Sequence, residues 1–154
     1  MTFEELKPKI NDILTNVSTL REEKLQKICF LLNENIDYYD WVGFYFRNGE
    51  KEELILGPYV GEKTDHTVIP FGKGICGQVA LSNEPFIVHD VSAEDNYIAC
   101  SASVKSEIVV PIFVNGENIG QIDIDSEVRD AFTEDDQAFL EYINYEIGKL
   151  FVES

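Results

Sequence analysis

Two aspartates near the end of the segment SEIVVPIFVNGENIGQIDIDS, residues 106–126, could bind a cation. Asp123 and Asp125 are two positions apart in an alternating apolar and polar run, so in a strand both side chains leave the same face. Neighbouring carboxylates in an apolar hairpin are costly unless a positive group meets them. One interpretation is that this face of the sheet is simply hydrated. The other is a pocket wall for a cationic group, such as the ammonium of a free amino acid.

The three cysteines differ in their surroundings. Cys29 falls on the apolar stripe of a predicted helix, which is typical of a small buried hydrophobe. Cys76 lies in the first turn of a glycine-flanked helix, where the positive end of the helix dipole and Lys73 favour a thiolate. Cys100 lies in an irregular segment ahead of the strand that bears Glu107. Cys76 and Cys100 are therefore either reactive thiols or two unrelated, half-buried cysteines.

An aromatic pair occupies the first predicted strand. Trp41 and Tyr45 share a face through Gly43, while Val42 and Phe44 make the opposite face apolar. A lone aromatic pair in a strand usually belongs to a core. Here the core already has the other face, so Trp41 and Tyr45 could instead line a pocket for an apolar or sulfur-bearing group.

The histidines do not form a recognisable metal motif. His66 and His89 could join Cys76 and Cys100, but no pair has the C-x-x-C or H-x-x-x-H spacing typical of a metal site. We therefore expect no bound metal. The run at residues 72–74 is also too short for a phosphate-binding loop.

The elements around these residues predict an α+β fold. Apolar residues at helical spacing indicate amphipathic helices near residues 3–17 and 25–36, a short helix at 74–81, and a terminal helix capped near 133–136. Six strands are predicted, at residues 41–47, 53–57, 67–69, 86–88, 107–114 and 119–125. We expect a central antiparallel sheet of about six strands, with the N- and C-terminal helices on one face. The irregular segments 59–66 and 90–105 would cover the opposite face and any ligand there.

Length, charge and cysteine content exclude several kinds of protein. The 154 residues are expected to form one domain, residues 1–154. The 12 basic and 29 acidic side chains give a net charge of −17, which disfavours nucleic acids and anionic membranes as partners. No apolar stretch could span a bilayer or serve as a signal peptide, and an odd number of cysteines argues against structural disulfides. We expect a cytoplasmic protein.

Six segments together resemble a known family. In chain order they are WVGFYF, LILGPYVG, IPFGKGICG, YIACS, KSEIVVPI and IGQIDIDS. They are similar to segments of the free methionine-(R)-sulfoxide reductases, which are single-domain GAF proteins, and the resemblance runs from about Trp41 to the terminal helix. It implies a GAF fold and an oxidoreductase acting on the free amino acid. It also implies thioredoxin as external reductant, no bound cofactor, and a homodimer.

The resemblance also assigns roles by position. Cys100 matches the nucleophile of the family, and Cys76 matches a cysteine that could serve as resolving thiol. A carboxyl group must protonate the departing sulfoxide oxygen, and Glu107 is the candidate. The implied substrate pocket is acidic and aromatic, with Glu107, Asp123, Asp125, Trp41 and Tyr45 in its wall.

The chain departs from the family pattern at a few positions. His66 stands where the family usually has its main resolving cysteine, Ser101 replaces an acid after the nucleophile, and Asn96-Tyr97 replaces a Gly-His pair. The alternative function is therefore non-catalytic. A GAF domain without that thiol could bind or sense an amino-acid-like ligand with no chemistry.

Overall fold

The computed structural model describes residues 1–94 and 103–152. In chain order its elements are α1 (Phe3–Thr15), α2 (Arg21–Asn35), β1 (Trp41–Arg47), β2 (Glu53–Val60), β3 (Val68–Pro70), α3 (Gly74–Ser82), β4 (Phe86–Val88), the 3₁₀ turn η1 (Val91–Ala93), β5 (Ser106–Val114), β6 (Glu117–Ser126) and α4 (Glu134–Val152). The strands form one antiparallel sheet in the order β3-β2-β1-β6-β5-β4. The predicted α+β fold with about six antiparallel strands is confirmed.

Three strands are longer than the alternation predicts, β5 by one residue and β2 and β6 by three each, because cross-strand pairing extends them. β2 continues to Val60, which pairs with Val42 of β1. β6 begins at Glu117, opposite Val114 of β5. The turn between β5 and β6 has positive φ at both Asn115 and Gly116, which fits the tight hairpin that this dipeptide predicts.

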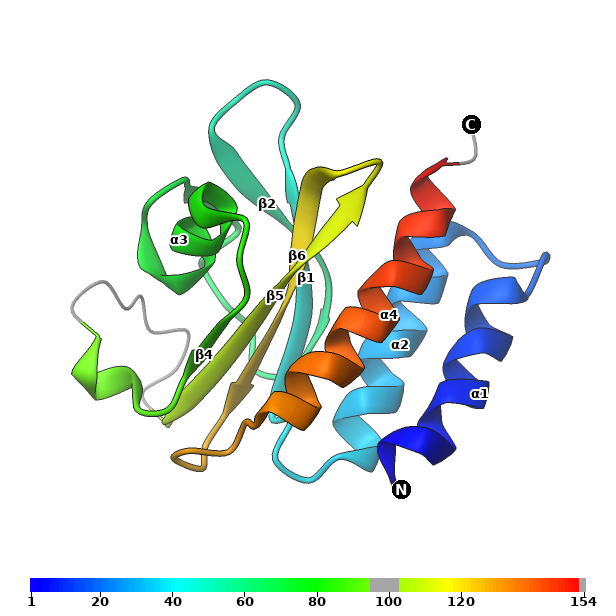
Figure 1. The fold of residues 1–154 in the computed structure, drawn as a ribbon, viewed down its shortest axis with the longest axis horizontal. Helices are drawn as coiled ribbons and strands as arrows, with labels where there is room; N and C mark the ends of the chain where they lie inside the picture. Colours follow the sequence, from blue (N-terminus) through cyan, green and yellow to red (C-terminus); the bar gives the residue numbers. More distant parts are fainter. Residues whose placement is uncertain (95–102, 153–154) are drawn as a thin grey trace.

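The helices divide between the two faces of the sheet. α2 and α4 lie along one face with α1 beside them, whereas α3 lies on the opposite side (Figure 1). The larger buried cluster joins α1, α2 and α4 to the sheet and includes Val42 and Phe44. A second cluster on the α3 side includes Trp41 and Tyr45. No helix in the described ranges is both long and apolar enough to cross a bilayer.

Candidate active site

Three carboxylates from β5 and β6 meet on the face of the sheet that α3 covers. Asp123 and Asp125 leave β6 two positions apart, and Glu107 of β5 pairs directly with Asp125. All three are buried, with exposures of 5% for Glu107 and 1% for each aspartate. The interpretation of a hydrated face is therefore wrong, because water has almost no access to these groups.

Helix α3 brings Cys76 onto the carboxylates. Its Sγ donates to Oδ2 of Asp123 at 3.3 Å, and one donor atom from each of Cys76, Glu107 and Asp123 lies within 4.8 Å of the others. The buried Gln121 holds this end of α3, because its Nε2 donates to the Cys76 carbonyl at 3.0 Å. Sequence reasoning missed Gln121, although the period of two from Asp123 puts it on the same face.

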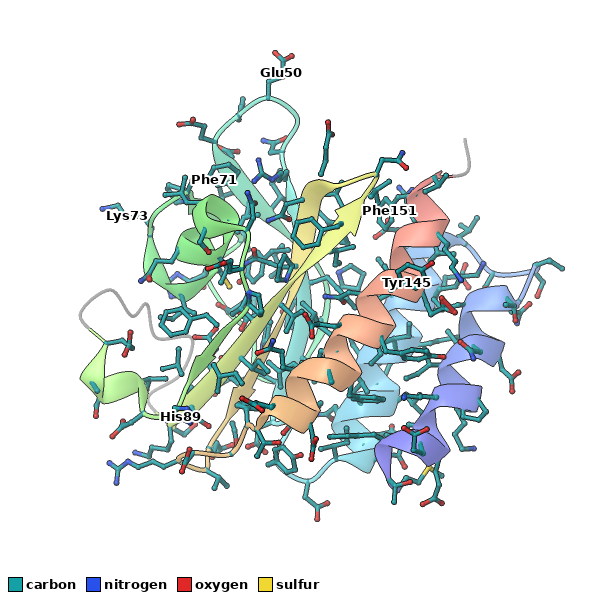
Figure 2. The ribbon with its side chains drawn as sticks, in the orientation of Figure 1. Glu50, Phe71, Lys73, His89, Tyr145 and Phe151 are labelled. Atoms are coloured by element: carbon teal, nitrogen blue, oxygen red, sulfur yellow. The ribbon has the colours of Figure 1, made fainter. Side chains whose placement is uncertain are left out.

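The surroundings of Cys76 favour its thiol form. Burial raises the pKa of Cys76 well above its ordinary value, and the charges of Asp123, Glu107 and Asp125 raise it further. Lys73 is exposed and points outward from α3 into solvent (Figure 2). The expectation that the helix dipole and Lys73 favour a thiolate is therefore wrong, because desolvation and the nearby carboxylates outweigh both.

Burial of two adjacent carboxyl groups favours one proton on the Glu107–Asp123 pair. Burial raises the pKa of Asp123, while hydrogen bonds with Glu107 and Cys76 act in the opposite direction. A hydrogen bond between two carboxyl groups needs a proton on one of them. Oδ1 of Asp123 is buried and has no hydrogen-bond partner in the part of the chain that the structure describes. The pair is thus a proton source beside a thiol, with one carboxylate oxygen still able to accept a ligand.

The aromatic pair lies beside this cluster. Trp41 stacks on Tyr59 with ring centroids 5.3 Å apart, and its Nε1 donates to the Glu62 carbonyl at 3.0 Å. The Trp41 ring crosses over Gly43, where a Cβ would lie 2.4 Å from Cη2, so only glycine fits there. The hydroxyl of Tyr45 donates to the backbone carbonyl of His66, in the segment 61–67, at 2.9 Å. The predicted shared face of Trp41 and Tyr45 is confirmed, and both rings are buried on the α3 side.

A cavity of about 20 Å³ adjoins the thiol. This is room for about one water molecule. The described residues that line it are Tyr45, His66, Ile69, Lys73, Gly74, Ile75, Cys76, Glu107 and Asp123. The structure therefore brings four predicted site residues to the cavity, whereas Trp41 and Asp125 are not in its lining.

Other predicted site residues lie elsewhere or outside the described ranges. Cys100, the predicted nucleophile, falls in residues 95–102, outside the described chain. His89 lies at the far end of β4 from α3, where its Nδ1 is 2.6 Å from Oδ1 of Asp130 (Figure 2). Cys29 is buried in the helical core as predicted.

Comparison with known proteins identifies the family. A model of the GAF domain matches residues 19–150. The free methionine-R-sulfoxide reductase of Saccharomyces cerevisiae is 45% identical over 138 residues, covering 88% of this chain and 72% of the yeast protein. The chain belongs to the free methionine-R-sulfoxide reductase family of GAF domains.

Two further relatives agree with this assignment. The Escherichia coli free methionine-R-sulfoxide reductase is 38% identical over 120 residues, which cover 78% of this GAF domain and 71% of the relative. The crystal structure of the Neisseria meningitidis enzyme in complex with its substrate superposes with a TM-score of 0.91 at 36% identity. That match covers 97% of this GAF domain and 88% of the Neisseria chain. The predicted GAF fold is confirmed.

Proposed function

We propose that this GAF domain reduces free methionine-(R)-sulfoxide to methionine, with Cys100 as nucleophile and Cys76 as resolving thiol. The relatives carry the name of this activity, and one contact in the structure supports it most directly. That contact is the thiol of Cys76 against Asp123, in a buried cavity that Glu107 also lines. A dry site that holds a thiol, a base and an acid has the groups that sulfoxide reduction needs.

The substrate would be held at both ends. Its ammonium would meet Asp123 and Asp125, whose burial strengthens the attraction to a cation. Its methyl-sulfinyl end would pack against Trp41 and Tyr45, since sulfur packs favourably on aromatic rings. A peptide-bound methionine sulfoxide has no α-ammonium group, so this pocket would select the free amino acid.

Reduction then needs one proton and one thiolate. The Cys100 thiolate attacks the sulfoxide sulfur, and the proton shared by Glu107 and Asp123 moves to the oxygen from the Glu107 side. The hydroxyl group then moves from the substrate sulfur to the Cys100 sulfur, so the sulfur–oxygen bond of the substrate and the new bond between the two sulfurs both break. Methionine leaves and Cys100 becomes a sulfenic acid. The substrate sulfur is thereby reduced and Cys100 is oxidised by the same two electrons.

Cys76 would restore the nucleophile. Its sulfur attacks the sulfenic acid of Cys100, and the thiol proton passes through Asp123, 3.3 Å away, to the hydroxyl group, which leaves as water when the disulfide forms. Thioredoxin, as external dithiol, would then reduce the disulfide. We propose that this cycle runs in the cytoplasm, in a homodimer and without a bound cofactor.

The cavity must enlarge before substrate binds. A volume of about 20 Å³ holds one water molecule, whereas methionine sulfoxide needs several times more. Trp41 and Tyr45 hold the segment 61–67 against the sheet by hydrogen bonds to the carbonyls of Glu62 and His66. We expect substrate entry to break one or both of these bonds.

A thioredoxin-coupled assay with the separate R and S epimers tests the proposal. The wild type should oxidise NADPH with the R epimer, and Cys100→Ser should lose that activity. Cys29→Ser is the matched control, because Cys29 is buried in the other core and should leave the rate unchanged. Turnover by Cys100→Ser would contradict the assignment. Tight binding of the R epimer with no turnover by the wild type would favour the non-catalytic alternative.

A further inference from the structure

Cys76, Glu107 and Asp123 form a compact set of donor atoms from three separate elements. One atom of each lies within 4.8 Å of the other two, and all three residues are buried. Sulfur and two carboxylate oxygens make a mixed soft and hard donor set. Such a set suits Zn²⁺ and metals that resemble it, whereas Mg²⁺ and Ca²⁺ prefer oxygen alone.

One distance within the set is close to that of a zinc site. Cys76 Sγ and Asp123 Oδ2 are 3.3 Å apart. Zinc–sulfur bonds of about 2.3 Å and zinc–oxygen bonds of about 2.1 Å at a tetrahedral angle would separate these two atoms by about 3.6 Å. The adjoining cavity of about 20 Å³ has room for one ion or one water, so a cation fits without the enlargement that an amino acid requires.

A second observation concerns Asp123, which lines the same cavity. Oδ1 of Asp123 is buried, and no group in residues 1–94 or 103–152 donates a hydrogen bond to it. The Asp123 residue is only 1% exposed, so water cannot satisfy this oxygen from outside. A buried carboxylate oxygen without a donor is costly, and a bound cation would remove that cost.

We propose that Cys76, Glu107 and Asp123 bind one Zn²⁺ ion, with a water molecule as fourth ligand. On binding, the thiol proton of Cys76 and the proton held by the Glu107–Asp123 pair leave to solvent, and the sulfur and both carboxylates bond to the metal, so affinity rises with pH. The site exists whether or not the chain is a reductase. If the proposed function holds, the bound ion also blocks disulfide formation by Cys76 and makes the enzyme sensitive to zinc.

X-ray absorption of the fully reduced, zinc-loaded wild-type protein tests the ligand set without any substitution. We expect one sulfur scatterer at about 2.3 Å and oxygen scatterers at about 2.0–2.2 Å. Two or more sulfur scatterers, or none, would overturn the assignment. This readout is independent of catalysis, so a protein inactive towards methionine sulfoxide could still confirm it.

Cobalt substitution tests the same site residue by residue. Reduced wild-type protein titrated with Co²⁺ should develop a thiolate-to-cobalt absorption band that saturates at one ion and is displaced by Zn²⁺ but not by Mg²⁺. Cys76→Ser should lose the band, and Asp123→Asn should weaken Co²⁺ binding at least about tenfold. Cys29→Ser is the control and should keep the full band. A band that survives in folded Cys76→Ser, or wild-type protein with no saturable band, would refute the site.

Discussion

Burial first, and the carboxylate of Asp123 second, keep Cys76 in its thiol form. Its Sγ donates to Asp123, and the negative charge of Asp123 is the largest electrostatic contribution after burial to the raised pKa of Cys76. The chemistry proposed above requires this control, because the thiol must stay protonated until the sulfenic acid forms. Residue Asp123 therefore has two tasks, which are to attract the substrate cation and to hold the Cys76 proton.

Replacing Asp123 with asparagine should make Cys76 more reactive. The substitution removes a nearby negative charge, so the pKa of Cys76 should fall and its thiolate fraction at a given pH should rise. In a Cys29→Ser, Cys100→Ser background, we expect iodoacetamide to alkylate Cys76 several-fold faster at about pH 8 once Asp123→Asn is added.

The control for this comparison is the same substitution on an exposed acid. Asp135→Asn, in the same background, should leave the alkylation rate of Cys76 unchanged, because Asp135 lies on the first turn of α4 and is exposed. Slower alkylation in Asp123→Asn than in its parent, with circular dichroism unchanged, would contradict the electrostatic role of Asp123.

Among the elements, a buried carboxylate in the first turn of α4, that of Asp136, joins this helix to the residues that precede β1. Oδ1 of Asp136 accepts hydrogen bonds from the hydroxyls of Tyr38 and Tyr39, both at 2.8 Å. Its Oδ2 accepts from the backbone nitrogen of Thr133 at 2.9 Å, which caps the start of α4. Asp136 thus joins the helix cap to a segment almost a hundred positions away in the chain.

Asp136→Asn should destabilise the fold by about 2–3 kcal/mol, because it weakens charge-assisted hydrogen bonds in a buried site. Asp135→Asn, one position earlier in the same turn and exposed, should cost less than about 0.5 kcal/mol. Urea unfolding measures both. Equal losses in the two variants would show that the tyrosine contacts contribute nothing.

The helices and strands, and the face of each strand from which a side chain leaves, could be predicted from the sequence. The contacts between elements that are distant in the chain could not. The alternation through Ile124 places Asp123 and Asp125 on one face, and the cap at Thr133 marks the start of α4. No period indicates that Cys76 would contact Asp123, because α3 packs on the sheet through side chains far away in sequence. The same holds for the partners of Asp136. The proposed zinc ligands give no sequence signal either, since they come from three elements and have no characteristic spacing.

At the scale of the whole molecule, the two faces of the sheet carry different buried groups. The helical face is an apolar core that includes Cys29, whereas the α3 face buries carboxylates with Cys76. Burial raises the pKa of both thiols above the ordinary value. The pKa of each of these thiols is therefore higher in the folded chain than in the unfolded chain. Below the unfolded-state pKa this difference stabilises the fold, and the stabilisation is lost as the pH rises above that value.

The free energy of unfolding should therefore fall above about pH 8.5, where unfolded thiols ionise, by about 1.4 kcal/mol per pH unit for each buried thiol. Cys29→Ala should make this slope shallower by the contribution of one buried thiol. The substitution should also lower the free energy of unfolding somewhat at neutral pH. Urea unfolding at several pH values between about 7 and 10 measures the slope. Identical slopes for wild type and Cys29→Ala would contradict the assignment of a raised pKa to Cys29.

Reduction of free methionine-(R)-sulfoxide should oxidise a thiol pair that includes Cys76. The most direct measurement is a count of free thiols in the fully reduced protein, before and after one turnover without reductant, with the disulfide mapped by mass spectrometry. We predict a fall from three thiols to one, with a Cys76–Cys100 bond and Cys29 still free. Three thiols retained in the presence of released methionine, or a disulfide that includes Cys29, would contradict the role of Cys76 as resolving thiol.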